Sequence, residues 1–388
     1  MRLRMLLPKV KPSHLELPEK CPHEECGSRY VRRYQVVRKK IRDTVEDEVV
    51  AWRCQCMACK RTFRVYPEGV DRSQTSLRVK GLAVMLYLLG LSYGAVSLAL
   101  EALGISMSKT QVYEAVQEAA RRVPGLRRRA VYGDIETPAV GADLTSVRCS
   151  GKWLPLGLGV DDTDGTTLTV DLLPGEDAET LKEWLDPVLE ATGAQLLVTD
   201  DADSFKQVAD AYDLDHQICK SHVQRNTETL VDDLKSKAQG SEDSSLKEIG
   251  VSAEEAQQHL ERLRELVKRR DPEEADELGK LYDRYTGSSP PKKGERASLA
   301  YRMYLLFLDR WNMWPRLTRY RSWRGPHGET VDGTNNGCER AIGWDIKERY
   351  RSMRGYKNPQ NALWVSRLLA WCGNNHRLGG ADLAQLLA

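Results

Sequence analysis

Three acidic residues, far apart along the chain, have the type and setting that metal-dependent chemistry requires. Asp143 lies inside an apolar run, Asp200 ends another, and Glu339 follows a polar turn at residues 334–336. Three carboxylates that converge can hold two divalent ions about 3.5–4 Å apart. Because every ligand is an oxygen atom, two Mg²⁺ (or Mn²⁺) ions are expected rather than zinc. One ion would activate a water or a 3′-hydroxyl and the other would stabilise the leaving oxygen of a phosphodiester.

Each acid also has an ordinary structural explanation. Asp is a poor strand former and is costly to bury, which favours a functional role for Asp143. Asp201 directly follows Asp200, and either could cap the next helix, so the choice of second ligand stays open. Glu339 taken alone would be a surface acid of a helix. Its interpretation therefore depends on the other two acids.

The elements that must position these acids alternate between strand and helix periodicity. Strands are predicted at residues 140–147, 153–160, 166–173, 195–199 and 216–219, and helices at 178–192 and 205–212. This order predicts an RNase H-like α/β domain. Its first and fourth strands are neighbours, so Asp143 and Asp200 are expected side by side. A later helix packed on the sheet would bring Glu339 to them.

A run of basic residues follows Glu339. At about 100° per residue, one stripe of this helix would carry four cations: Arg340, Lys347, Arg351 and Arg354. Cys338, Ile342 and Ile346 would form the apolar side. Glu339 would lie near the boundary, so the pattern predicts that the basic stripe holds a nucleic-acid backbone beside the acid.

The cysteines indicate a second kind of metal site. Of nine cysteines, five lie between residues 21 and 59, which is unlike a disulfide framework. Cys21 and Cys26 form one pair and Cys56 and Cys59 another, separated by a hairpin-like stretch, as in a zinc ribbon with structural Zn²⁺. Cys54 competes with Cys56 as the third ligand.

Residues 74–123 are predicted to form helices. Segments 82–89, 91–103 and 109–122 have helical spacing, with a glycine-containing turn before the last. This arrangement fits a helix-turn-helix, although a plain helical hairpin is an equal alternative. In the first reading, Ser108, Lys109 and Gln111 would face DNA bases. A basic linker, Arg127, Arg128 and Arg129, follows and is also assigned to DNA.

A further pair of possible metal ligands, Cys219 and His222, lies at the end of the last predicted strand. A Cys-x-x-His pair can bind zinc, but no second pair stands nearby in the sequence. We therefore expect a structural role, in which these residues support the strand end near the acids.

Charge is distributed unevenly along the 388 residues. Residues 1–130 have a net charge of +12, residues 131–280 of −19 and residues 281–388 of +9. Basic ends around an acidic middle suggest segments that face nucleic acid. The N-terminus lacks a secretory signal pattern, and the apolar run 82–103 is broken by polar residues and glycine. A cytoplasmic, nucleoid-associated, prokaryotic protein with no membrane partner is expected.

These motifs together resemble the DDE insertion-sequence transposases, the bacterial relatives of the Mutator-like superfamily. The resemblance rests on residues 141–143, 198–200, 219–226, 334–340 and 354–356. It implies that Asp143, Asp200 and Glu339 bind the catalytic metals. In that family the second Asp is usually followed by Gly, whereas Asp201 follows here. The resemblance also covers a helical insertion, where Trp311, Trp314 or Trp323 could stack on DNA.

The resulting hypothesis is a DNA transposase that binds terminal inverted repeats, cleaves to give 3′-OH ends and joins them to target DNA. A homodimer on double-stranded DNA is expected. The predicted domains are a zinc ribbon (1–70), a helix-turn-helix with basic linker (71–130), the first part of the RNase H-like core (131–223), an all-α insertion (224–325) and the final core helices (326–388). The alternatives are a domesticated, non-catalytic DNA-binding regulator and an RNase H-like structure-selective nuclease.

Overall fold

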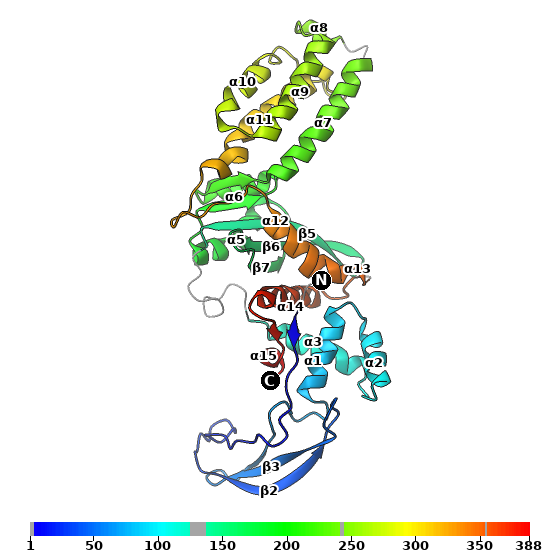
Figure 1. The fold of residues 1–388 in the computed structure, drawn as a ribbon, viewed down its shortest axis with the longest axis vertical. Helices are drawn as coiled ribbons and strands as arrows, with labels where there is room; N and C mark the ends of the chain where they lie inside the picture. Colours follow the sequence, from blue (N-terminus) through cyan, green and yellow to red (C-terminus); the bar gives the residue numbers. More distant parts are fainter. Residues whose placement is uncertain (1–3, 125–136, 241–243, 354) are drawn as a thin grey trace.

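A five-stranded mixed sheet forms the centre of the computed structural model, which describes residues 4–124, 137–240, 244–353 and 355–388 (Figure 1). Its strands are β5 (Ala139–Cys149), β6 (Lys152–Asp161), β7 (Thr167–Leu172), β8 (Leu196–Thr199) and β9 (Asp215–Ile218). The spatial order is β7-β6-β5-β8-β9. β5, β6 and β7 are antiparallel, whereas β8 and β9 run parallel to β5. This topology confirms the predicted RNase H-like α/β core.

Helices cover both faces of the sheet. α5 (Ala178–Thr192) and α6 (Asp203–Ala211) pack on the face that contains Val140, Ala142 and Leu197. α12 (Asn336–Ala341) and α14 (Pro359–Arg377) lie on the opposite face, where Val147 and Val160 contribute to the core. Because side chains alternate along a strand, Asp143 shares the face of Val147 and therefore faces α12.

The chain between β9 and α12 contains a helical insertion, drawn at the top of Figure 1. It consists of α7 (Lys220–Gly240), α8 (Ser245–Glu248), α9 (Ala253–Arg269), the 3-10 turn η1 (Pro272–Glu274), α10 (Ala275–Asp283) and α11 (Leu299–Ser322). These helices have their own apolar core. α11 continues past Pro315 and returns to the sheet, where Gln217 accepts a hydrogen bond from the backbone N–H of Tyr320.

Below the sheet in Figure 1, the N-terminal helices share one core with the C-terminal ones. The N-terminal helices are α1 (Leu77–Leu88), α2 (Tyr93–Ala102) and α3 (Lys109–Arg121), and the C-terminal ones are α14 and α15 (Ala384–Leu387). The short strands β1 (Met5–Leu6) and β10 (Ala381–Asp382) pair in parallel and join the two ends of the chain. α3 packs directly against α14 and α15, and α1 also contacts α15.

The most N-terminal sheet is a three-stranded antiparallel ribbon at the bottom of Figure 1. Its strands are β2 (Val31–Lys40), β3 (Glu48–Cys56) and β4 (Thr62–Val65). Throughout the part of the chain that the structure describes, no helix is long and apolar enough to cross a membrane.

Candidate active site

Asp143 lies in β5, at the point where α12 approaches the sheet most closely. A Cβ atom at Gly141 would come within 3.3 Å of both Asn335 Oδ1 and Cys338 Sγ and within 3.0 Å of Val160. Glycine at this position therefore allows the helix to contact the strand. The result is that Asp143, two residues further along the same face, lies beside the beginning of α12.

Asn335 attaches α12 to this strand. Its side-chain amide donates a hydrogen bond of 3.0 Å to the carbonyl of Ala142, and the residue is fully buried. The sequence suggested that Asn335 and Asn336 mainly start the helix, but Asn335 makes no side-chain capping bond. Asn335 instead fixes the distance between Glu339's helix and Asp143's strand. In the sequence, Asn335 was recognisable only as one of the polar residues that precede Glu339.

The two neighbouring aspartates after β8 point to different partners. Asp200 Oδ1 accepts a hydrogen bond of 3.1 Å from the backbone N–H of Ala202, and the charge of Asp200 acts on Asp143. Asp201 instead forms an ion pair of 2.8 Å with Lys206, and its charge acts on Arg310 of α11. These contacts associate Asp200, rather than Asp201, with Asp143.

Glu339 lies in the first turn of α12, close to the start of α7. Its Oε1 is 3.5 Å from Nε2 of His222 and 4.0 Å from a guanidinium nitrogen of Arg225. One ligand atom each from Cys219, His222 and Glu339 lie within 4.8 Å of one another. Cys219 also accepts a hydrogen bond of 3.3 Å from the backbone N–H of Asn335. The Cys-x-x-His pair thus contacts the acid and the segment before it, as a supporting role requires.

Electrostatics link the three acids. Burial, together with the negative charges of Asp200 and Glu339, raises the pKa of Asp143 to about 7, whereas the Leu144 N–H and Lys347 oppose this shift. The backbone N–H of Leu144 donates to Asp143 Oδ1 over 2.8 Å. A half-buried carboxyl next to two others favours its neutral form unless a cation compensates the charge.

The arrangement fits divalent cations bound by oxygen. Oε1 of Glu339 is buried and, among the described residues, accepts no hydrogen bond. The three carboxylates do not form a single group within 4.8 Å in the described chain, and two ions held about 3.5–4 Å apart do not require one. Asp143 stands between the other two in charge interactions, as a residue shared by two ions would.

The helix that carries Glu339 changes its geometry after Ala341. A π-helical turn, η2 (Ile342–Lys347), separates α12 from α13 (Glu348–Arg351). A π turn inserts an extra residue and so shifts the following side chains around the axis by about 100°. The predicted single stripe is therefore divided: Arg340 lines one pocket, whereas Lys347 and Arg351 line another. Arg354 lies outside the described residues.

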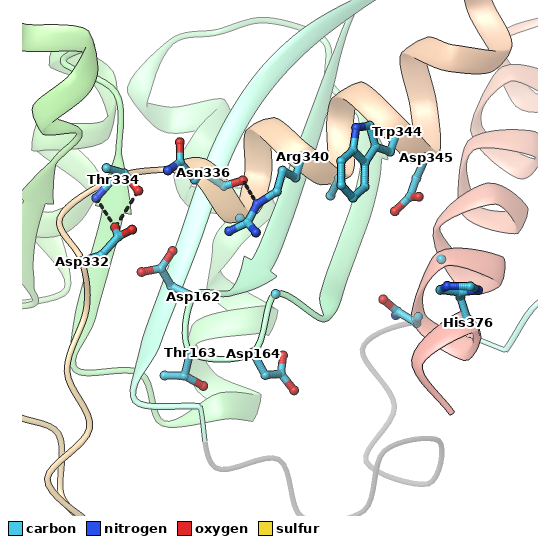
Figure 2. A pocket seen from close by; sticks show the side chains of 15 residues that line it. Asp162, Thr163, Asp164, Asp332, Thr334, Asn336, Arg340, Trp344, Asp345 and His376 are labelled. Carbon is cyan, nitrogen blue, oxygen red and sulfur yellow. Dashed lines mark hydrogen bonds between the residues drawn. The ribbon is translucent and has the colours of Figure 1, made fainter. Parts of the chain in front are cut away.

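The pocket beside Arg340 is acidic (Figure 2). Asp162 and Asp332 line it, and Thr334 donates its backbone N–H and hydroxyl to Asp332. Burial raises the pKa of Asp162 to about 8, with Asp332 and Asp161 acting in the same direction and Arg340 opposing them. The sequence marked this aspartate-rich segment only as a turn, because its partners come from distant parts of the chain.

The four predicted zinc ligands meet. One sulfur each from Cys21, Cys26, Cys56 and Cys59 lie within 4.8 Å of one another. Two of the sulfur separations are 3.8 Å and 3.6 Å, close to the edge of about 3.8 Å of a tetrahedron with zinc–sulfur bonds of about 2.3 Å. Hydrogen bonds from the backbone N–H groups of Cys59 and Ala58 lower the pKa of Cys56 to about 6. Cys54 is buried outside this group.

The remaining predicted DNA contacts occupy varied positions. Ser108 and Gln111 form a reciprocal capping box at the start of α3, and Lys109 is exposed beside them. Arg127, Arg128 and Arg129 lie outside the described residues. Of the three tryptophans considered for stacking, Trp314 and Trp323 are buried, whereas Trp311 is 40% exposed and stacks on Tyr282. The helix-turn-helix function stays a prediction.

Comparison with protein families decides the family of the chain. The family described as "Transposase IS66 family" matches residues 80–344, more than half of the sequence. The chain belongs to the IS66 transposase family. The predicted DDE transposase class is thereby supported, whereas the Mutator-like assignment is wrong because IS66 is a different family.

Two further comparisons add little to the IS66 assignment. A solved structure of the HTLV-2 integrase catalytic core domain in complex with magnesium, in dimeric form, is similar to this chain at 19% sequence identity and a TM-score of 0.19. The similarity covers 26% of this chain and 72% of that one. No curated protein matched the chain.

Proposed function

We propose that this IS66 family member is a metal-dependent DNA transposase. It binds the terminal inverted repeats of its element, cleaves DNA to give 3′-OH ends and joins those ends to target DNA. Asp143, Asp200 and Glu339 bind two Mg²⁺ (or Mn²⁺) ions. The observation that carries this proposal is the placement of the acids: Asp143 lies on β5 beside the beginning of α12, which carries Glu339, and the charges of Asp200 and Glu339 act on it.

The residues around the acids have distinct tasks in this reaction. The bound ions supply activation of the attacking hydroxyl and stabilisation of the leaving oxygen. Asp143 bridges the site from β5, and Asn335 keeps the helix of Glu339 against that strand. His222 and Arg225, which approach Glu339 Oε1, orient its carboxylate, and Arg225 adds a guanidinium that can contact a DNA phosphate.

The N-terminal part binds the ends of the element. Cys21, Cys26, Cys56 and Cys59 hold a structural Zn²⁺ and so keep the β2–β3 ribbon in one conformation. α3 presents Lys109 near its exposed N-terminus, and the basic linker follows. Lys347 and Arg351 contact the DNA backbone near the acids. Because two ends must be joined together, the active form is a dimer on DNA.

A strand-transfer assay tests this proposal. The wild-type chain is incubated with labelled end-sequence DNA and a target plasmid in Mg²⁺, and the products are resolved on a denaturing gel. We expect cleaved and joined strands with the wild type and a loss of about 10³-fold or more with Asp143→Asn.

The other outcomes identify the alternatives. Cleaved but unjoined strands would overturn the transposase proposal in favour of a structure-selective nuclease. Specific binding without cleavage in any divalent metal would indicate a regulator. Undiminished joining by Asp143→Asn would show that this carboxylate does not bind the catalytic metal ions.

A further inference from the structure

A groove of about 670 Å³ lies on the side of Glu339's helix opposite the acidic pocket. One wall is the tip of the β5–β6 hairpin, with Arg148 and Trp153, and the other consists of Lys347, Tyr350, Arg351 and Met353. Its volume is in the range of pockets that bind small organic groups, about 300–1,000 Å³. The groove therefore has room for a nucleotide.

The hairpin wall is held in place by the segment after α13. The backbone N–H of Tyr356 donates a hydrogen bond of 2.8 Å to the carbonyl of Arg148. The backbone N–H of Ser150 donates to the carbonyl of Tyr356, also over 2.8 Å. Gly355, with φ of 119°, passes so near that an added Cβ would lie 2.6 Å from the carbonyl oxygen of Arg148. The groove is thus part of the folded chain and does not depend on a bound molecule.

Arg148 and Trp153 form a directly opposed cross-strand pair of β5 and β6. Side chains in such a pair lie on the same face with Cβ atoms about 4.5–5.5 Å apart. The Trp153 side chain is 67% exposed. The pair therefore offers a flat aromatic surface and a cation at a spacing that suits a base and its phosphate.

Positive charge in the groove is available to a ligand. Throughout the described residues, no carboxylate lies within ion-pair distance of Arg148 or Lys347; Arg351 pairs with the exposed Glu348 over 2.8 Å. An aromatic surface with cations on both walls matches single-stranded nucleic acid. The same composition fits poorly with an apolar peptide.

Lys347 connects this groove to the carboxylates. Its positive charge acts on Asp143, while its side chain lines the groove. Ser146 and Arg148, which line the groove, lie three and five residues beyond Asp143 on the same strand, and their side chains project from the opposite face of that strand. A strand whose phosphate lies at the acids would reach the groove with its adjacent nucleotides.

We propose that the groove binds an unpaired DNA nucleotide next to the reacting phosphate, with its base stacked on Trp153 and its phosphate contacted by Arg148 and Lys347. This inference rests on the proposed function and extends it, since it requires the DNA end to be unpaired at that position. Stacking on an exposed indole is tolerant of base identity.

Binding of two labelled DNA probes to the full chain tests the proposal. One is a blunt duplex and the other is the same duplex with a short thymidine overhang, made in both polarities, with no Mg²⁺ or Mn²⁺ added so that the strands are not cleaved. We expect the wild type to bind one overhang probe about 5- to 100-fold more tightly than the blunt probe, as one stacked base would give. Trp153→Ala should abolish this preference, and Trp153→Phe should keep most of it.

Two further variants keep the test sharp. Trp344→Ala removes a tryptophan of similar exposure, 52%, from the acidic pocket and should retain the preference. Arg148→Gln should reduce the salt slope of overhang binding by about 0.7, the value for one phosphate contact on a single strand. Equal binding of blunt and overhang probes by the wild type, or an unchanged preference in Trp153→Ala, would overturn the groove assignment.

The outcome is separable from that of the proposed function. An overhang preference that depends on Trp153, in a chain that never joins strands, would sustain the groove and reject the transposase. Normal joining with no such preference would do the reverse.

Discussion

The thiol cluster and the carboxylate cluster differ in how close their ligand atoms lie to one another. Sulfur atoms of Cys21 and Cys59 lie 3.8 Å apart, and those of Cys26 and Cys56 3.6 Å, separations that suit four ligands of one tetrahedral ion. Asp143, Asp200 and Glu339 interact through charge without converging on one point. A closed set of ligands suits a structural metal, whereas an open set leaves coordination positions for a substrate.

The contrast also has an electrostatic side. Burial raises the pKa of Cys21 to about 12, whereas backbone N–H groups stabilise the thiolate of Cys56, so this second sulfur favours a bound cation. Asp143 is in the opposite condition, because burial and like charges oppose its ionisation. The difference is the one expected between a structural metal site, whose binding energy would add to folding, and a site whose buried acid disfavours its charged form.

The largest expected effect separates catalysis from folding at the open cluster. Glu339→Gln should lower the strand-transfer rate by about 10³-fold or more, because a neutral amide is a poor ligand for Mg²⁺. Zinc content and melting temperature should stay near the wild-type values. The control is Asp162→Asn, in the acidic pocket beside Arg340, and its strand-transfer rate should stay within about threefold of the wild-type rate. A large loss of strand transfer in Asp162→Asn, without one in Glu339→Gln, would show that the catalytic metals bind in the acidic pocket and contradict the assignment of Glu339.

The next effect belongs to the closed cluster. Cys56→Ser should abolish zinc binding and cost on the order of 5 kcal/mol or more of stability in the N-terminal ribbon, because metal-binding energy in such sites is folding energy. Cys54→Ser, two residues away on the same strand, should retain one zinc per chain. Metal content by mass spectrometry and proteolysis of the ribbon measure both. Zinc loss in Cys54→Ser with retention in Cys56→Ser would contradict the assignment of ligands.

A smaller effect concerns stability of the metal-free chain against pH. The folded pKa of Asp143, about 7, lies above its ordinary value of 3.8, so the folded state binds the proton more tightly. Its contribution to stability is therefore present below about pH 4 and is lost as the pH rises to about 7.

Asp143→Asn removes this pH-dependent loss. With no Mg²⁺ or Mn²⁺ added, the variant should be more stable than the wild type at pH 8 by on the order of 1–3 kcal/mol and nearly equal at pH 4. Chemical denaturation at the two pH values measures the difference. A variant that is less stable at pH 8 would show that the charge of Asp143 is already compensated within the fold.

Much of the architecture follows from local sequence signals. Helix α5 has the predicted bounds because Asp177 caps its beginning and Gly193, in the left-handed conformation, ends it. The strands β5 to β9 were predictable because turn residues separate apolar runs. The acids were recognisable since a strand aspartate is unusual. These signals depend only on neighbouring residues.

The missed features depend on contacts between distant segments. The π-helical turn that divides the basic residues into two groups has no simple periodic signature, so a constant 100° per residue placed Arg340 on the side of Lys347. Asn335 looked like a helix start because its partner, Ala142, is nearly two hundred residues away. By contrast, the sequence already favoured Cys56 over Cys54 from its spacing to Cys59, and the sulfur cluster contains Cys56.

The most direct measurement compares Asp200→Asn with Asp201→Asn in Mg²⁺-dependent strand transfer. The two residues are adjacent and chemically identical, so effects on folding and net charge are matched. The account predicts a loss of about 10³-fold or more for Asp200→Asn and less than about tenfold for Asp201→Asn, whose carboxylate pairs with Lys206. Full activity in Asp200→Asn would contradict the carboxylate site at the centre of this account.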